Sequence, residues 1–204
     1  MSTITRTRPR TLSTPNSELP NSELNNVYTD EELMQDVAKG DIEAFGEIVR
    51  RNQRYAWNTA WRLLQDPAEA EDAAQDAFLK ILDAAPRYRP TAAFRTYLCR
   101  VVTRLCLDRL EKKKPLYTDA PPVSTSPRPD PSDELAARDR ASVVERALQT
   151  LPPRQRTALV LQYFEDLSYK EIAEAMGASV KSVERLLARG RDALADQLEE
   201  WRQR

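Results

Sequence analysis

Apolar residues recur at helical spacing in two blocks of the chain, which a polar, proline-rich stretch separates. In the first block the spacing predicts helices over residues 29–39, 42–64, 67–84 and 94–110. In the second block it predicts a helix over 133–151, another that Pro152 and Pro153 open, and two short helices within 167–194. No segment shows the alternation typical of a half-buried strand, so the predicted fold class is all-α, with two small helical domains.

Composition divides the chain into four segments. Residues 1–26 are rich in Thr, Ser, Pro and Asn, and hold too little apolar surface to offset the entropy of folding, which favours a disordered arm. Residues 115–132 contain six prolines in eighteen positions, a composition typical of a flexible linker. The two helical domains are therefore expected over 27–114 and 133–204.

The segment 167–194 carries the local signals of a helix-turn-helix motif. Ser168 can cap a helix while Glu171 reaches back to it, which forms a capping box. Gly177 permits a tight turn, and Ser179 can cap the next helix. The apolar side of that next helix comprises Val183, Leu186, Leu187, Leu194 and Leu198. The opposite side comprises Lys181, Glu184, Arg185, Ala188 and Arg189. Such a helix fits the major groove of DNA; the alternative is a solvated helical hairpin.

Charge is segregated along the first block, although the whole chain has a net charge of only −1. Between Gln65 and Asp83 there are six acidic residues and one lysine, and between Arg87 and Lys114 there are nine basic residues and two acidic ones. A uniformly basic nucleic-acid binder is therefore excluded, but strong local fields are expected. The acidic stretch fits a basic protein partner, with a solvated face as the alternative.

The basic stretch contains the predicted helix 94–110, whose two sides differ in chemistry. One side comprises Phe94, Leu98, Val101, Val102 and Leu105. The other comprises Thr96, Tyr97, Arg100, Thr103 and Arg104, and follows Arg87, Tyr88 and Arg89. Cations bind phosphates, and aromatic rings stack on bases freed from a duplex. This side is therefore interpreted as a site for opened DNA, with a solvated face as the alternative.

Residues that catalysis and metal binding commonly use are scarce. The chain has no histidine, which argues against a zinc site and excludes histidine-dependent triads. Cys99 and Cys106 lie seven positions apart on one predicted helix, a rise of about 10.5 Å, which is too long for a disulfide. We expect both to be small core residues of a protein without enzymatic activity or cofactor. No apolar run predicts a signal peptide or membrane insertion.

Four motifs carry a resemblance to a known family. They are AKGDIEAFGEIV (38–49), DPAEAEDAAQDAFLKI (66–81), FRTYLCRVVTRLCLDRL (94–110) and LPPRQRTALVLQYFEDLSYKEIAEAMGASVKSVERLLARGRDAL (151–194). The chain resembles sigma-70-family transcription initiation factors of the extracytoplasmic-function (ECF) group. Region 29–110 resembles their second conserved region, a helical bundle, and region 133–204 resembles their fourth, a helix-turn-helix unit.

The resemblance implies a function and its partners. Such a protein binds the β′ clamp region of core RNA polymerase, reads duplex promoter DNA at the −35 element and helps melt the −10 element. It works in the bacterial cytoplasm at the nucleoid, is not an enzyme, and is restrained by an anti-sigma factor. The residues implied for polymerase binding are Asp72, Gln75, Asp76, Phe78 and Leu79. Those implied for the −10 element are Arg87, Tyr88, Arg95, Tyr97, Arg100 and Arg104. Those implied for the −35 element are Lys181, Ser182, Glu184, Arg185, Ala188, Arg189 and Arg191.

Some positions depart from the family pattern. Position 97 is usually Trp and is Tyr here, which offers a smaller stacking platform. Position 104 is commonly Asn and is Arg here, which favours phosphate contact over base reading. Glu184 and Arg185 are also unusual. Glu can accept a hydrogen bond from the amino group of cytosine, and Arg can bind guanine, so we expect this helix to recognise a specific base sequence.

Two other function classes fit parts of the chain. A conventional helix-turn-helix regulator with an N-terminal sensing or dimerisation domain explains 133–204, but gives the basic stretch 87–114 no purpose. A helical adaptor that binds no DNA predicts no salt dependence of nucleic-acid binding.

Overall fold

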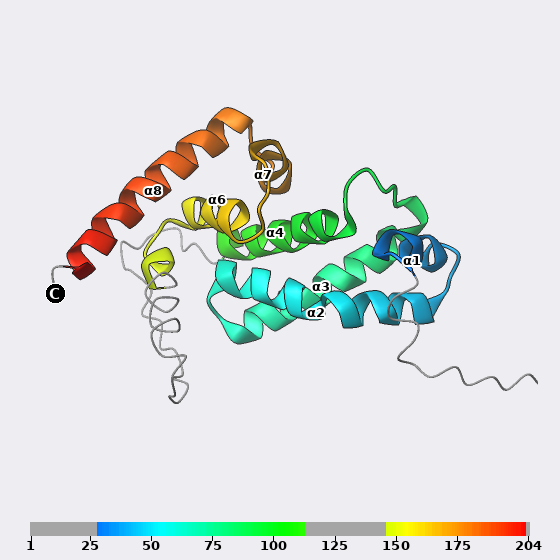
Figure 1. The fold of residues 1–204 in the computed structure, drawn as a ribbon. Coiled ribbons are helices and arrows are strands. Elements are labelled where there is room, and N and C mark those ends of the chain that lie inside the picture. The colour runs from blue at the N-terminus through cyan, green and yellow to red at the C-terminus, as the bar shows by residue number, and fades with distance from the viewer. Residues whose placement is uncertain (1–27, 113–145, 203–204) are drawn as a thin grey trace, which may run out of the picture.

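The computed structural model describes residues 28–112 and 146–202, and every regular element within these ranges is helical (Figure 1). The predicted all-α fold class is therefore confirmed. The predicted arm 1–26, the linker 115–132 and most of the predicted helix 133–151 lie outside the described residues.

The first block forms four α-helices and one short 3₁₀ helix. They are α1 (Asp30–Val37), α2 (Ile42–Leu64), α3 (Pro67–Ala84), η2 (Ala85–Arg87) and α4 (Phe94–Lys112). Side chains fix where three of them begin. The Thr29 hydroxyl caps α1 in a capping box with Glu32, while the carboxylates of Asp41 and Asp66 accept backbone N–H groups in the first turns of α2 and α3 at 2.9–3.1 Å.

These helices pack tightly around a core that is rich in alanine. Ala56 and Ala60 on α2 and Ala70, Ala73 and Ala77 on α3 are all fully buried. Such short side chains let two helix axes approach closely. Larger side chains fill the remaining interior; Ile48, Leu63, Ile81, Leu98 and Val102 have no exposed surface.

The second block forms α6 (Pro153–Tyr163), α7 (Tyr169–Met176) and α8 (Val180–Arg202). α6 contacts α7 and α8, and it also lies against α2 and α4. The buried apolar residues of the two blocks consequently belong to one continuous cluster. α7 lies across α4, and α8 extends away from the first block (Figure 1). The position of α7 decides which basic residues of α4 reach solvent.

Candidate nucleic-acid interfaces

The helix-turn-helix geometry predicted for 167–194 is confirmed. Ser168 Oγ accepts the N–H of Glu171 at 3.3 Å, and the Glu171 carboxylate accepts the N–H of Ser168 at 2.9 Å. Gly177 ends α7 at φ 58°, in the left-handed region that glycine adopts without strain. Ser179 Oγ accepts the N–H of Ser182 at 3.2 Å and so caps α8.

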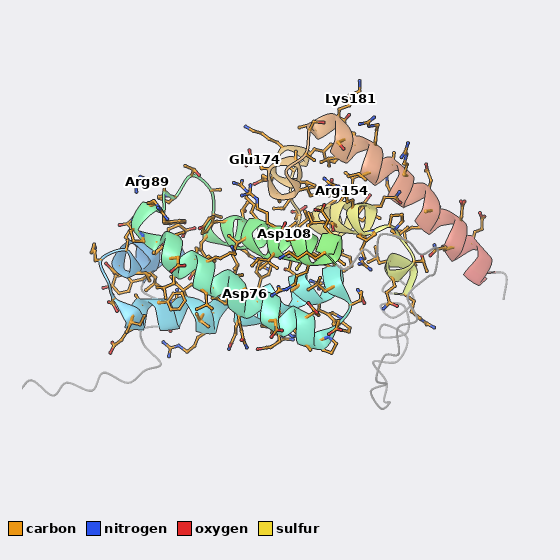
Figure 2. All side chains as sticks on the ribbon, turned by 180° about the vertical axis from the view of Figure 1, so that it is seen from behind. Asp76, Arg89, Asp108, Arg154, Glu174 and Lys181 are labelled. Carbon is orange, nitrogen blue, oxygen red and sulfur yellow. The ribbon has the colours of Figure 1, made fainter. Side chains whose placement is uncertain are left out.

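One face of α8 is buried and the other is open. Val183 and Leu187 have no exposed surface and hold the helix against α6 and α7. Six of the residues implied for the −35 element are exposed, namely Lys181, Glu184, Arg185, Ala188, Arg189 and Arg191, and Ser182 is half-buried. The exposed side chain of Lys181 lies at the far end of α8 from the chain terminus (Figure 2). Val180 is also 41% exposed; the sequence motifs did not single it out, yet an apolar group at this end can contact a thymine methyl.

Gly190 is a structural requirement of this motif that the sequence reading missed. A Cβ at this position would lie 2.8 Å from Leu159 Cδ1 and 3.2 Å from Leu159 Cγ. The glycine therefore permits the close approach of α8 to α6. A lone glycine inside a strongly helical pattern is the signal that could have indicated this contact.

Arg191 lies beside two tyrosines. Hydrogen bonds with the hydroxyls of Tyr163 and Tyr169 raise the pKa of its guanidinium above the ordinary value. Tyr163 is 61% exposed. These contacts orient Arg191 at the edge of the exposed face of α8.

The basic aromatic helix α4 is more covered than its sequence predicts. Thr103, predicted on the polar side, has no exposed surface, so that prediction is wrong. The physical reason is that α4 contacts α2, α3, α6 and α7, which together cover more of its circumference than one apolar stripe accounts for. Cys99 and Cys106 are fully buried, as expected.

Tyr97 sits in an aromatic cluster. Its ring centroid lies 5.3 Å from that of Tyr88 and 6.3 Å from that of Phe94, both in tilted geometry. Burial raises the pKa of Tyr97, and burial together with the nearby Glu31 carboxylate raises the pKa of Tyr88 to about 12. Both rings are half-buried, so packing holds their orientation while part of each remains accessible.

The arginines implied for the −10 element differ in their surroundings. Arg87 and Arg95 are exposed, and the Arg95 guanidinium stacks over Tyr55 at 4.0 Å from the ring centroid. Arg100 and Arg104 both contact Glu174 of α7. The structure therefore places two of these cations against the second block, a contact that the sequence did not predict.

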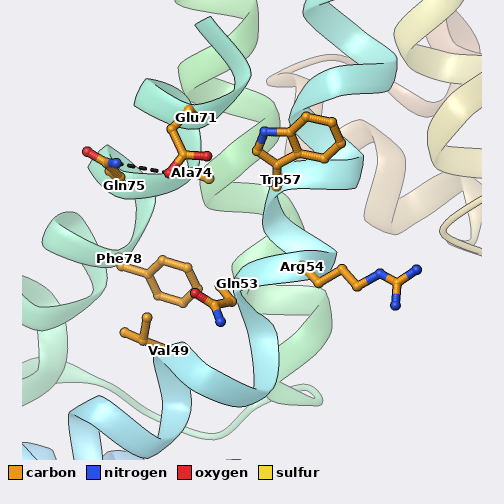
Figure 3. Close-up of a pocket in the computed structure, with 8 residues that line it drawn as sticks. All are labelled: Val49, Gln53, Arg54, Trp57, Glu71, Ala74, Gln75 and Phe78. Atoms are coloured by element: carbon orange, nitrogen blue, oxygen red, sulfur yellow. Dashed lines mark hydrogen bonds between the residues drawn. The ribbon is translucent and has the colours of Figure 1, made fainter. Parts of the chain in front are cut away.

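The acidic helix α3 borders a groove of about 510 Å³ between α2 and α3 (Figure 3). The residues that line it are Val49, Gln53, Arg54, Trp57, Glu71, Ala74, Gln75 and Phe78. Among the residues implied for polymerase binding, Gln75 and Phe78 line this groove, and Leu79 is 60% exposed beside it. Asp72 is exposed as well, whereas Asp76 pairs with Arg109 of α4 at 2.5 Å. The α2 wall of the groove was not predicted.

Other chemistries find no support in residues 28–112 and 146–202. No group of His, Cys, Asp and Glu there could hold a metal ion. No helix in these two ranges is long and apolar enough to cross a membrane.

Comparison with known proteins decides the family. Residues 48–115 match the family model of sigma-70 region 2, and residues 142–194 match that of sigma-70 region 4. The ECF RNA polymerase sigma factor SigW of Bacillus subtilis is 32% identical over 176 residues, which cover 81% of this chain and 94% of SigW. The chain belongs to the ECF sigma factors.

Solved structures share the fold. CnrH, solved in complex with the cytosolic domain of CnrY, matches this sigma factor with a TM-score of 0.61 at 25% identity, over 84% of this chain and 97% of CnrH. The sigma factor RpoE of Bartonella quintana, solved with the anti-sigma factor NepR, shares the fold with a TM-score of 0.58 at 18% identity, over 76% of this chain and 96% of RpoE.

Proposed function

We propose that this sigma factor binds core RNA polymerase, directs it to promoters through their −35 and −10 elements, and assists promoter melting. The observation that carries the proposal is one chain with two faces of different chemistry. The exposed face of α8 suits duplex DNA, whereas α4 and the loop before it combine arginines with a fixed aromatic cluster. A conventional helix-turn-helix regulator is not favoured, because the first block matches sigma-70 region 2.

The −35 element is assigned to α8. Six of the seven residues implied by the family motif are exposed on this helix, and we assign base-edge contacts to Glu184 and Arg185 among them. Arg189 and Arg191 are one to two turns further along the helix and suit phosphates, which position the protein without specifying sequence.

The −10 element is assigned to α4 and the preceding loop. The half-buried Tyr97 offers a ring to an unstacked base, and Arg87, Arg95, Arg100 and Arg104 offer cations to the single strand, with Tyr88 supporting Tyr97. We infer that this part of the protein traps opened DNA.

Core polymerase is assigned to the groove between α2 and α3, where the β′ clamp region would bind. Phe78 and Gln75 line this groove, and apolar Leu79 and acidic Asp72 and Asp76 belong to the same helix, α3. An apolar contact area flanked by charge is typical of protein interfaces.

The remaining assignments follow from family membership. We infer that the protein acts in the bacterial cytoplasm at the nucleoid, that it initiates transcription without being an enzyme itself, and that an anti-sigma factor restrains it. The last point is supported by the shared fold with RpoE, which was solved with such a factor.

In vitro transcription with core polymerase on a library of promoter sequences tests the proposal. We expect the protein to confer initiation on a subset of templates that share −35 and −10 sequences, and to co-purify with core polymerase. Binding to duplex DNA without any transcription or polymerase association would instead support the conventional regulator.

A further inference from the structure

Two carboxylates of the second block lie against basic residues of the first. Glu174 belongs to α7 and Glu165 to the loop between α6 and α7. They contact different helices, α4 and α2 respectively. The two contacts can therefore be tested separately and together.

Glu174 covers part of the surface assigned to the −10 element. Its carboxylate lies 3.0 Å from Arg100 Nη2, and its backbone carbonyl accepts a hydrogen bond from Arg104 Nη2 at 3.1 Å. The Arg100 side chain is only 24% exposed as a result. Glu174 lies on α7, which packs against α4, whereas Lys181 lies at the tip of α8 (Figure 2).

Glu165 reaches into an arginine-rich pocket of about 320 Å³. The pocket is lined by Arg51, Arg54, Tyr55, Asn58, Arg62, Arg95, Phe164 and Glu165. The Glu165 side chain is 1% exposed; its Oε1 lies 3.0 Å from Thr59 Oγ1 and 3.5 Å from Arg62 Nη1. The Arg62 guanidinium also stacks on Phe164 at 4.6 Å. A carboxylate thus fills a site whose lining has the chemistry of an anion-binding pocket.

Tyr55 adds a neutral donor to this pocket. Burial, with further contributions from Cys99 and Glu165, raises the pKa of Tyr55 above its ordinary value. Its hydroxyl keeps its proton and hydrogen-bonds Glu165. Hydroxyl donors and arginines serve a phosphate oxygen equally well.

The reading face of α8 remains uncovered in the same arrangement. Lys181, Glu184 and Arg185 are exposed. The closed chain thus presents the residues assigned to duplex DNA while it covers part of those assigned to opened DNA.

We propose that Glu165 and Glu174 form an acidic clasp that closes the second block over the basic surface of α2 and α4, where phosphates of a single DNA strand compete with them. The assignment of this surface to DNA rests on the proposed function, whereas the closure itself does not. The open chain would offer its phosphate ligand both Arg100 and the arginine-rich pocket.

The contacts suit a reversible clasp. The Arg100–Glu174 pair is partly exposed, and such pairs are weak and sensitive to salt. Arg62 Nη1 lies 3.5 Å from Glu165 Oε1, a contact that compensates a buried carboxylate less than a bidentate pair would. A polyanion that supplies several phosphates can therefore displace both carboxylates.

Energy transfer between two dyes tests the closure. Asp83→Cys on α3 and Asp192→Cys on α8 place labels at exposed positions of the two blocks. The native thiols stay unlabelled, because Cys99 and Cys106 are fully buried and burial raises the pKa of each to about 12. In this background we compare the parent chain, Glu165→Gln, Glu174→Gln and the double variant.

The matched control is Asp108→Asn, which makes the same charge change at an exposed position of α4 itself. The probe is a labelled single-stranded oligonucleotide, with its duplex form in parallel. Thermal melting of each variant confirms that it is folded.

We expect lower transfer efficiency and about fivefold tighter single-strand binding for the double variant, a change of the size that one partly exposed ion pair such as Arg100–Glu174 contributes. Asp108→Asn should alter neither beyond its small charge effect, and the oligonucleotide should lower transfer in the parent chain. Unchanged transfer in the double variant would overturn the clasp. Lower transfer without tighter binding would retain the closure, but overturn the competition with DNA and count against the assignment of α4 to the −10 element.

Discussion

At the scale of single residues, the space around a helical glycine determines whether a larger side chain can replace it. Gly190 lies where α8 meets α6, and Gly46 lies on α2 with no atom within 4 Å of its missing Cβ. Both glycines are helical, so both forgo the helix propensity of alanine. The difference between them is the space available.

Alanine substitution at these two glycines should have opposite effects. Gly46→Ala should raise the free energy of unfolding by up to about 1 kcal/mol, because it adds helix propensity without a clash. Gly190→Ala should lower it by about 1 kcal/mol, because overpacking against Leu159 outweighs the same gain. Urea denaturation measures both. Stabilisation by Gly190→Ala would show that Leu159 moves aside without cost.

Base preference should reside in Glu184 and Arg185. Replacing either with Ala should cost about 1–3 kcal/mol per lost base contact and relax the preferred −35 sequence at that base. A binding selection from random duplexes measures this preference. Asp192→Ala, an exposed change two turns further along α8, is the control; an identical selected sequence for Glu184→Ala and the parent would contradict the assignment.

At the scale of elements, helix starts follow local chemistry and can be predicted from sequence. The sequence predicts the beginnings of α2, α3 and α6 and the capping box of α7, because Asp, Ser and Pro act on groups within three residues. Helix ends are less local. α1 ends at Val37 rather than Lys39, and α4 continues to Lys112 rather than Leu110.

The capping box of α7 should make stability depend on pH. Hydrogen bonds from the Ser168 hydroxyl and N–H lower the pKa of Glu171 in the folded state. A lowered folded pKa means that the carboxylate stabilises the fold above its unfolded pKa of about 4.3, and that this contribution is lost as the pH falls through the folded value.

Glu171→Gln should therefore lower the free energy of unfolding by about 0.5 kcal/mol at neutral pH. The effect is small because solvent screens the charge of this side chain. In acid the decrease should be smaller still. Denaturation at both pH values measures the difference. Glu199→Gln, near the C-terminal end of α8 where a negative charge gains nothing from the helix dipole, should not show it. A constant difference between the Glu171 variant and the parent across this pH range would contradict the role of the charge.

At the scale of the whole molecule, contacts between residues far apart in the chain could not be predicted from the sequence. Arg104 and the Glu174 carbonyl that it contacts lie seventy positions apart, and no local pattern relates them. Thr103, which is fully buried, was misplaced for the same reason, because the helices that contact α4 come from both blocks. The groove between α2 and α3 was not predicted: the motif implied Gln75 and Phe78 for polymerase binding, but gave no indication of the opposite wall.

Assembly with polymerase should depend on an exposed leucine beside that groove. Leu79→Ser should weaken binding to core polymerase about tenfold, as the loss of one apolar anchor at an interface does, while leaving the melting temperature unchanged. Ile42→Ser is the control, because Ile42 is 65% exposed and Leu79 60%, but Ile42 begins α2 and is not among the residues implied for polymerase binding. Equal weakening by both changes, measured by fluorescence anisotropy, would argue against a specific surface.

The contact of Gly190 with α6 is also a point about which a small tilt of α8 would displace its N-terminal end. Lys181 lies nine residues from Gly190, about 14 Å along the helix axis. A tilt of about 10° around the contact would move the reading end by about 2 Å, enough to break a hydrogen bond to a base edge. The packing of Gly190 against Leu159 thus fixes the tilt of α8, and with it the position of the N-terminal residues of α8 relative to DNA.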